Sequence, residues 1–395
     1  MKKNSLALSN YVTIYENHSQ SFSPTDMVKI CKRMHNPKRD FLFVNPLQGK
    51  HIPVNPSKAF SLFEELTQEV IKGTNKTEKI VVIGFAETAT AIGNYLACHL
   101  PNCIYYMQTT REILSNKTPI LEFKEEHSHA TEQLLYGDIR SLQKCDRILF
   151  VDDEISTGNT ILNFIHELER IGIHANYGVA SILNWQNQEW ANKFNCLKIS
   201  TFCLLRGEIA NLKTIVPIPS SCSDTTFVKI ECNPNVVEVP CDVSNFSKER
   251  LGFVPCHFKM FSNILYSQII AQISNYLPKS NENILVLGTE EYMFSPMVFG
   301  KMLAEEQHVN VCCHATTRSP IETSTLKDYA IQYRYPITSA YNKERKTYVY
   351  NLRKYDRVYI VTDVIPTEAF MTDISSTLVS TGCKLDTIVF IVLKG

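Results

Sequence analysis

A chain of 395 residues is too long for one ordinary α/β domain and long enough for two, each with its own hydrophobic core. Lysine plus arginine and aspartate plus glutamate each number 40, so the formal net charge is zero, and no overall field favours nucleic acid or an anionic membrane as a partner. The 13 cysteines are scattered without a C-x-x-C pair, and no run of about 18 apolar residues occurs, which predicts a cytoplasmic protein that does not span a membrane.

The first half of the chain alternates between apolar strands and amphipathic helices. Helices are expected from Thr88 to Leu100 and from Thr160 onward, and a long polar excursion runs from Arg111 to Asp146. Strands are expected at the apolar runs Ile80–Gly84, Cys103–Met107, Arg147–Val151, Asn176–Leu183 and Leu197–Phe202. Because strands and helices alternate, we expect a doubly wound α/β fold with a mostly parallel sheet.

Two carboxylates, Asp152 and Asp153, close the strand Arg147–Val151, and a short turn leads from them into the next helix. The turn and the first helical residues are Ser156, Thr157, Gly158, Asn159 and Thr160. Backbone N–H groups at a helix N-terminus, joined by hydroxyl groups, favour a phosphate, and the two carboxylates are placed to accept hydrogen bonds from both hydroxyls of a ribose. The pattern predicts a ribose-phosphate site; the alternative is an ordinary α/β loop with a capped helix.

This segment resembles the loop of type I phosphoribosyltransferases that binds phosphoribosyl pyrophosphate (PRPP). The resemblance implies that the loop after the first strand, with Gly84 and Ala86, binds pyrophosphate through backbone N–H groups. Glu87 in that loop would repel pyrophosphate unless a Mg²⁺ ion lay between them, so Glu87, Asp152 and Asp153 are candidate metal ligands. The alternative role for Glu87 is capping of the helix N-terminus.

The predicted catalytic residues are Asp153, Arg111 and two histidines. Arg111 ends the second strand, where its guanidinium is placed to grip the departing pyrophosphate; the alternative is a solvated surface residue. His127 and His129 lie in the polar excursion, which we expect to close as a lid that excludes water, with the histidines donating to pyrophosphate or moving a proton. The alternative for this segment is a solvated hairpin.

The second half of the chain repeats landmarks of the first in the same order. The strand Ile284–Gly288 corresponds to Ile80–Gly84, and Ala315–Arg318 corresponds to Gln108–Arg111. The loop that begins at Asp363 has lost one carboxylate and the turn glycine and has gained another carboxylate, so we do not expect this half to bind PRPP in the same way. The pattern favours a duplicated fold over chance similarity between two α/β units.

The expected organisation is a phosphoribosyltransferase domain over residues 1–205, a linker with hairpins over 206–250, and a degenerate copy over 251–395. Residues of the second half that are candidates for binding a substrate are Glu290, Thr317, Arg318 and Ser319.

Nearly the whole chain resembles the phosphoribosyltransferase-like proteins of tellurite-resistance stress operons. Their C-terminal TRSP domain is named after a tetrapeptide that stands here as Thr317-Arg318-Ser319-Pro320, and the resemblance also covers residues 36–45, 49–54 and 127–131. It implies two tandem, Rossmann-like phosphoribosyltransferase domains, the second degenerate. It also implies a cytoplasmic protein that acts beside operon-encoded ATP-grasp and phosphatase-like enzymes in making a nucleotide-like metabolite.

The predicted activity is that of a glycosyltransferase that uses PRPP and Mg²⁺ to transfer phosphoribosyl to an unidentified nucleophile. Purine-salvage members of the superfamily carry an acidic general base where this chain has Ser156, so a purine acceptor is not expected. One alternative is a non-catalytic regulator that senses PRPP or a nucleotide. Another is hydrolytic or phosphorolytic cleavage of a nucleotide-like compound. The oligomeric state stays open, with a homodimer as one option.

Overall fold

The computed structural model describes residues 6–9, 12–34, 41–123, 133–209, 224–225, 227–231, 233–240 and 249–394. The predicted lid residues His127 and His129 lie outside the described residues. The chain forms two compact units, each assembled from three segments. Unit 1 comprises residues 1–24, 60–213 and 244–258, and unit 2 comprises residues 25–59, 214–243 and 259–395.

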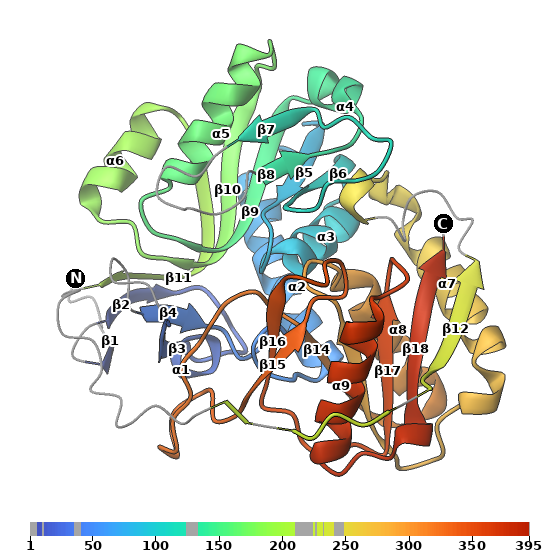
Figure 1. Cartoon of the computed structure of the whole chain (residues 1–395). Coiled ribbons are helices and arrows are strands. Elements are labelled where there is room, and N and C mark those ends of the chain that lie inside the picture. Colours follow the sequence, from blue (N-terminus) through green and yellow to red (C-terminus); the bar gives the residue numbers. More distant parts are fainter. Residues whose placement is uncertain are drawn as a thin grey trace. The chain divides into compact units, whose positions relative to one another are not determined.

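Unit 1 is built around a nine-stranded sheet with the strand order β1-β2-β11-β10-β9-β5-β6-β8-β7 (Figure 1). The strands from β11 to β6 run parallel, and antiparallel pairs extend the sheet at both edges. The strands are β1 (Leu6–Ser9), β2 (Val12–Asn17), β5 (Ile80–Gly84), β6 (Cys103–Thr110), β7 (Leu121–Phe123), β8 (Gln133–Leu135), β9 (Arg147–Ile155), β10 (Asn176–Asn184) and β11 (Ser200–Ile209).

Helices cover both faces of this sheet (Figure 1). On one face, Phe164 and Leu168 of α5 pack into a core with Phe150 of β9. On the other face, α3 comes so close to β5 that a side chain at Gly93 would stand 3.0 Å from the Cα of Gly84. The helices of unit 1 are α2 (Pro56–Gly73, which begins in the last residues of a unit 2 segment), α3 (Thr90–His99), α4 (Ile139–Lys144), α5 (Asn159–Arg170), α6 (Gln188–Cys196) and the short turns η1 (Glu249–Leu251) and η2 (Pro255–His257).

The predicted α/β alternation is confirmed, and the differences lie at the ends of elements. Strand β9 continues past its expected end to Ile155, because Asp152 still pairs with Ser181 on the neighbouring strand β10. Helix α3 begins at Thr90, two residues later than expected, because residues 86–89 form a turn. Strand β11 begins at Ser200 rather than at Leu197.

Unit 2 contains a five-stranded parallel sheet with the order β12-β18-β17-β13-β14. Its strands are β12 (Asn235–Pro240), β13 (Asn283–Gly288), β14 (Asn310–Ala315), β17 (Arg357–Thr362) and β18 (Ile388–Lys394), and two antiparallel pairs stand beside it, β3 (Lys29–Lys32) with β4 (Phe41–Val44) and β15 (Arg334–Thr338) with β16 (Lys346–Tyr350). Its helices are α1 (Pro24–Met27), α7 (Phe258–Gln272), α8 (Phe294–Gln307), α9 (Glu368–Ser380) and the short turns η3 (Ser274–Tyr276) and η4 (Leu385–Thr387). None of the helices in the described ranges is long and apolar enough to cross a membrane.

The two sheets share one topology. In unit 1 the chain runs from β5 to β6 on one side and then to β9 on the other side of β5; in unit 2 it runs from β13 to β14 and then to β17 in the same way. In each unit the strand order therefore reverses beside the first strand of the repeat. This shared order confirms the predicted tandem of two α/β copies.

A pair of hydrogen bonds at the amino ends of the strands also occurs in both units. In unit 1, the backbone N–H of Lys79 donates to Asp146 Oδ2 at 2.7 Å, and the N–H of Asp146 donates back to the Lys79 carbonyl at 2.8 Å. In unit 2, Asn283 and Asp356 make the same two hydrogen bonds at 2.8 and 2.9 Å. Chance similarity between unrelated α/β folds does not account for a matched pair of this kind.

An ion pair next to these contacts is duplicated too. Arg147 Nε lies 3.1 Å from Glu78 Oε2 in unit 1, and Arg357 Nε lies 3.2 Å from Glu282 Oε2 in unit 2. In both pairs each side chain is less than a fifth exposed. The two pairs clamp the amino ends of β9 and β17 to the residues that precede β5 and β13.

Residues 25–59 belong to unit 2, although the sequence places them before the first strand of unit 1. Val54 and Cys313 exchange backbone hydrogen bonds of 2.9 and 2.7 Å, which cover the open edge of β14. The contiguous domains expected at 1–205 and 251–395 therefore differ from the compact units. The reason is that an edge strand has unpaired backbone N–H and C=O groups. A segment from a distant part of the sequence can pair with them through its own backbone alone.

His314 on β14 helps to hold this segment, and its titration predicts acid sensitivity. Its ring nitrogens lie 3.1 Å from the Gly49 carbonyl oxygen and 3.0 Å from that of Tyr350. Burial, aided by the charge of Lys50 and opposed by the two carbonyl groups, lowers the pKa of His314 from 6.5 to about 4. Because the folded-state pKa lies below the unfolded one, the stabilising effect is complete above pH 6.5 and is lost as the pH falls toward 4.

We expect the free energy of unfolding to drop by roughly 3 kcal/mol over that interval on account of His314 alone. Urea unfolding followed by circular dichroism at several pH values measures the drop. The difference between the native chain and His314→Gln isolates it, since the glutamine variant does not titrate there. A native profile parallel to that of the variant would contradict the assignment.

Candidate functional site

The candidate site of unit 1 lies at the carboxyl ends of β5 and β9, where the strand order reverses. In open parallel sheets, ligands bind in the crevice at such a reversal. Gly84, the last residue of β5, pairs with Val151 of β9, and the N–H of Phe85 donates to the Val151 carbonyl at 2.9 Å. One loop begins at Phe85, and the carboxylates follow Val151 on the paired strand. The loop and the carboxylates therefore lie at neighbouring positions on the sheet.

The N-terminus of α5 has the features of an anion site. Its N-cap is Gly158, in the left-handed conformation (φ 76°, ψ 12°), with no side chain capping the helix and no acidic residue in the first turn. Thr157 Oγ1 accepts from the N–H of Asn159 at 3.3 Å and so holds the turn. The first-turn N–H groups of a helix have no partner within the helix, so they point toward whatever lies beyond Gly158.

The two carboxylates of β9 repel each other at this position. The N–H of Asp153 donates to Asp152 Oδ1 at 2.9 Å. Burial, and after it the negative charge of Asp153, raises the pKa of Asp152 well above its usual range. A bound cation, or a ligand that donates hydroxyl hydrogens, would reduce the unfavourable energy of ionising the two carboxyl groups side by side. Strongly shifted pKa values are common at ligand-binding sites, which makes the pair a candidate for one.

The loop after β5 is tightly packed. A side chain at Gly84 would stand 2.7 Å from the hydroxyl oxygen of Tyr106, so only glycine fits there. The N–H of Ala86 donates to Thr109 Oγ1 at 2.8 Å, which ties this loop to the end of β6. The peptide bond between Ala86 and Glu87 is cis, and the side chain of Glu87 is buried.

A buried polar network, which was not predicted from the sequence, stands behind this loop. Asn94 Nδ2 donates to the Thr90 carbonyl at 2.8 Å and to the Tyr106 hydroxyl at 2.9 Å, and Tyr106 also lies 3.2 Å from Gln108 Oε1. All four residues are buried. The network fixes the first turn of α3 against β6 and hence the end of the loop. Polar residues on an otherwise apolar helix and strand were the available signal.

A second missed residue is Gln186, which follows β10. Its amide nitrogen would be 3.4 Å from a side chain at Gly158, and Gln186 is buried. Within the described part of the chain, this nitrogen has no hydrogen-bond partner. An unused donor thus lies against the N-cap of α5.

Arg111 follows directly after β6 and is half-buried. The N–H of its neighbour Glu112 donates to Thr110 Oγ1 at 3.0 Å, which fixes the turn at that strand end. The structure thus places Arg111 just beyond the end of β6, and β5 lies between β6 and the strand that carries Asp152. The catalytic role of Arg111 stays a prediction, as do the lid roles of His127 and His129.

The donor set suits Mg²⁺ held together with a substrate. In the described ranges, no group of three or more His, Cys, Asp or Glu side chains is arranged to hold a metal ion by itself. Mg²⁺ in phosphate-transferring sites is held by one or two carboxylates together with phosphate oxygens and water, and Asp152 and Asp153 are neighbouring carboxylates on β9. The residues therefore fit this ion when it arrives with a phosphorylated ligand.

Unit 2 has the corresponding loops in the corresponding places. The N–H of Glu290 donates to Thr316 Oγ1 at 2.9 Å, as Ala86 does to Thr109 in unit 1. The N–H of Ser319 donates to Thr317 Oγ1 at 3.1 Å, as that of Glu112 does to Thr110. Glu290 therefore takes the place of Ala86, and Arg318 takes the place of Arg111.

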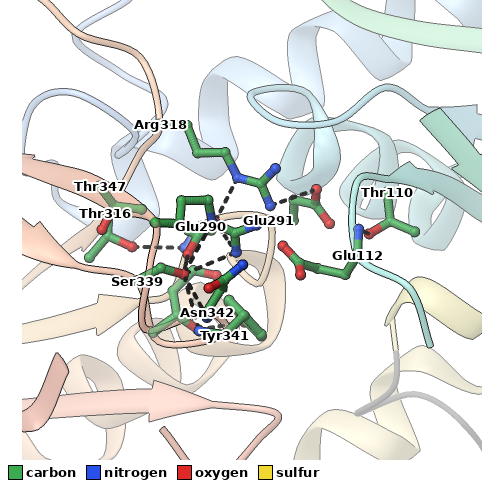
Figure 2. A network of polar contacts seen from close by, with 12 residues as sticks. Thr110, Glu112, Glu290, Glu291, Thr316, Arg318, Ser339, Tyr341, Asn342 and Thr347 are labelled. Carbon is green, nitrogen blue, oxygen red and sulfur yellow. Dashed lines mark hydrogen bonds and ion pairs between the residues drawn. The ribbon is translucent and has the colours of Figure 1, made fainter. Parts of the chain in front are cut away.

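Two of the substrate candidates of unit 2, Glu290 and Arg318, belong to a dense polar network (Figure 2). Arg318 Nε lies 2.7 Å from Glu290 Oε2, and Arg345 Nη2 lies 3.1 Å from the same oxygen. Tyr341, which the loop before β16 supplies, donates to Asp363 Oδ1 at 2.7 Å. The network thus brings Glu290 and Arg318 together; their roles in binding a substrate stay predictions.

The helix that corresponds to α5 lacks the open N-terminus. The N-cap of α9 is Thr367, whose side chain accepts from the N–H of Phe370 at 3.2 Å, and Glu368 stands in the first turn. The hydroxyl group of Thr367 thus caps α9, whereas no side chain caps α5. The expectation that unit 2 does not bind PRPP in the same way as unit 1 stays a prediction.

Comparison with known proteins gives two family matches. Residues 27–208 match the model described as "Phosphoribosyl transferase", and residues 247–378 match that of the "TRSP domain C terminus to PRTase_2". None of the curated proteins matches the chain.

Solved structures of adenine phosphoribosyltransferases are similar at low identity. That from Rhodothermus marinus is 18% identical, with a TM-score of 0.33, over 46% of this chain and 94% of its own. That from Trypanosoma brucei, in complex with AMP, pyrophosphate and ribose-5-phosphate, is 14% identical, with a TM-score of 0.34, over 45% and 76%. That from Giardia lamblia, complexed with 9-deazaadenine, is 14% identical, with a TM-score of 0.33, over 46% and 93%.

The matched segments and the two copies of the fold agree in their order along the chain. The first family model describes transferases of the phosphoribosyl group, which are glycosyltransferases, and it covers β5, β9 and the loop between β9 and α5. The second covers most of the degenerate copy. The chain therefore has the architecture that the two family models describe, a phosphoribosyl transferase segment followed by a C-terminal TRSP domain.

Proposed function

We propose that unit 1 uses PRPP and Mg²⁺ to transfer a phosphoribosyl group to a nucleophile. The observation that carries this proposal is the uncapped N-terminus of α5 beside the carboxylates of β9, at the reversal of the strand order. The first-turn N–H groups from Gly158 onward, with the hydroxyl groups of Ser156, Thr157 and Thr160, bind the 5-phosphate. Asp152 and Asp153 accept hydrogen bonds from the two ribose hydroxyls.

The leaving group is bound by the loop after β5. The backbone of residues 84–87 faces the pyrophosphate, and Arg111 compensates the charge that builds up on it. Asp152 and Asp153, with Glu87, would hold Mg²⁺, which when bound neutralises phosphate charge. Asp153 also stabilises the positive charge that develops on the ribose ring as pyrophosphate leaves.

The nucleophile attacks the anomeric carbon from the face opposite the pyrophosphate, so the configuration inverts. Ser156 is not an acidic base, which supports an acceptor other than a purine. His127 and His129 lie outside the described residues; their proposed role is to donate to pyrophosphate or to move a proton, in a lid that excludes water. The resemblance to TRSP proteins supports this reaction. It implies a cytoplasmic protein that acts beside operon-encoded ATP-grasp and phosphatase-like enzymes, which would complete a nucleotide-like stress metabolite.

Tryptophan fluorescence provides a direct test of PRPP binding. The chain has two tryptophans, Trp185 and Trp190, both in unit 1, and the N–H of Trp185 donates to the carbonyl of Ile155 at 2.7 Å. A ligand that orders the turn after Ile155 should change the emission of Trp185. We expect a saturable change with PRPP only when Mg²⁺ is present, and a smaller response to ribose 5-phosphate.

Turnover is tested separately by phosphorus NMR of PRPP with the protein, Mg²⁺ and a metabolite extract. Release of pyrophosphate that depends on the extract supports transfer. Binding without release in any extract supports a PRPP-sensing regulator instead. Release of ribose 5-phosphate from a nucleotide-like component without PRPP would support the cleavage reaction. Absence of binding would contradict all readings that involve PRPP.

A further inference from the structure

One carboxylate in unit 2 is surrounded by the donors of an anion site. Glu290 Oε2 lies 2.7 Å from Arg318 Nε and 3.1 Å from Arg345 Nη2, and Ser339 Oγ donates to its other oxygen, Oε1 (Figure 2). The Glu290 side chain is 1% exposed. Two guanidinium groups and a hydroxyl group that converge on one acceptor are the groups that proteins use to bind carboxylates and phosphates.

The position of Glu290 adds a second, independent observation. Through its hydrogen bond to Thr316, Glu290 corresponds to Ala86, which lies in the loop that we propose for pyrophosphate in unit 1. Arg318 corresponds to Arg111, the residue proposed to bind that same leaving group. In unit 2 the Glu290 carboxylate therefore contacts Arg318. The counterpart of Arg318 in unit 1, Arg111, is the arginine that we propose to bind a ligand.

The backbone conformation of Glu290 is energetically unfavourable. Glu290 has φ 49°, in the left-handed region, where a residue with a side chain is strained by about 1–2 kcal/mol. The carbonyl oxygen of Glu290 accepts from Lys50 Nζ at 2.6 Å, so a third cationic group helps to fix the residue. Contacts with cationic groups thus hold a conformation that the backbone alone disfavours.

We propose that the loop after β13 is an oxyanion-binding site that the chain fills with its own carboxylate, that of Glu290. Native unit 2 consequently takes no phosphate at this position. If the carboxylate is removed and space is left, the arginines should accept a compact oxyanion from solution, such as acetate or inorganic phosphate. Removing Glu290 takes away the carboxylate that both arginines share, although Glu291 Oε1 stays 3.8 Å from Arg318 Nη2. Loss of a buried charge partner is unfavourable, so the captured anion should restore order.

The test is anion rescue of Glu290→Ala in the full chain, followed by hydrogen exchange of peptides that contain Arg318 and Ser339. In chloride buffer we expect exchange there to be roughly a hundredfold faster than in the native chain. Acetate or phosphate at millimolar concentration should slow it to near the native rate, with a saturable dependence on concentration. The tryptophan emission of unit 1 should stay native throughout.

Two matched variants separate specific capture from general salt stabilisation, which excluded ions such as phosphate also produce. Glu282→Ala removes the partner of Arg357, 3.2 Å away, in the same unit but at the amino ends of the strands. Glu290→Gln removes the charge but fills the space. We expect no saturable rescue in either variant. Equal rescue in either one, or none in Glu290→Ala, would overturn the proposal.

If Glu290→Ala does not fold in chloride, its refolding yield from urea provides the same comparison. A yield that rises in acetate or phosphate relative to chloride, while that of Glu282→Ala does not, supports the site. Equal responses of the two variants overturn it. Because anion rescue is measured in unit 2, a negative result here leaves the proposed PRPP site of unit 1 unaffected.

Discussion

We expect PRPP binding to be lost when Asp152 and Asp153 are both replaced by asparagine, while unit 1 stays folded. Hydrogen bonds from a hydroxyl to a carboxylate are each worth about 1.5–3 kcal/mol, so we expect Kd to rise at least about a hundredfold. Isothermal titration calorimetry with PRPP and Mg²⁺ measures the loss. Retained affinity would count against the assignment of the ribose site.

The same substitution should not weaken the protein. Burial and the charge of Asp153 hold the pKa of Asp152 well above its usual range, which means that ionising Asp152 beside Asp153 destabilises the folded state. Asparagine removes that charge at nearly constant volume. The double variant should therefore melt at the same temperature as the native chain or higher, and this distinguishes a lost site from a lost fold.

The raised pKa also fixes the direction of a pH effect. Since the folded pKa of Asp152 is raised, protonation favours the folded chain, and this contribution disappears as the pH rises through the folded pKa. Mg²⁺ with PRPP needs the ionised form. Affinity in the presence of Mg²⁺ should therefore increase with pH through that range, while the ligand-free protein becomes less stable.

Asp363→Asn in unit 2 is the matched control for this experiment. Asp363 corresponds to Asp153 in the repeat and accepts from Tyr341 at 2.7 Å. We expect PRPP affinity to stay native in this variant. A parallel loss would mean that the two halves hold coupled or equivalent sites.

The turn between β9 and α5 could be predicted from sequence because its signals are local. Asp152, Asp153 and Gly158 lie within a few residues of each other, and an apolar strand followed by an amphipathic helix fixes where they stand. The repeat could be predicted for a similar reason, since Thr109 and Thr316 end strands that look alike.

Contacts between distant residues could not be predicted in this way. Nothing near Glu290 in the sequence indicates that Arg345 will bind its carboxylate, or that Val54 will pair with Cys313 and draw residues 25–59 into unit 2. Asn94 and Tyr106 meet only because α3 packs on β6. Such contacts depend on tertiary structure, where one chain position constrains another through packing rather than through local propensity.

Gly158→Ala should damage both the fold and the site. At φ 76° an alanine is strained, and its Cβ would stand 2.4 Å from Phe194 Cζ on the neighbouring helix. Left-handed strain and overpacking together predict a loss of about 2–5 kcal/mol in the free energy of unfolding. Because the strain is relieved by moving the turn, PRPP affinity should also fall at least about tenfold in calorimetry.

Gly172→Ala, at the other end of the same helix, separates the two causes. Gly172 has φ 80°, but an added Cβ would meet nothing within 4 Å. It should therefore show only the backbone cost of about 1–2 kcal/mol, with native PRPP affinity. Equal losses of affinity in the two variants would mean that helix stability, rather than the shape of the turn at Gly158, controls binding. A loss confined to Gly158→Ala ties the phosphate to the N-terminus of α5, because the two glycines share a conformation and a helix and differ in what lies beside them.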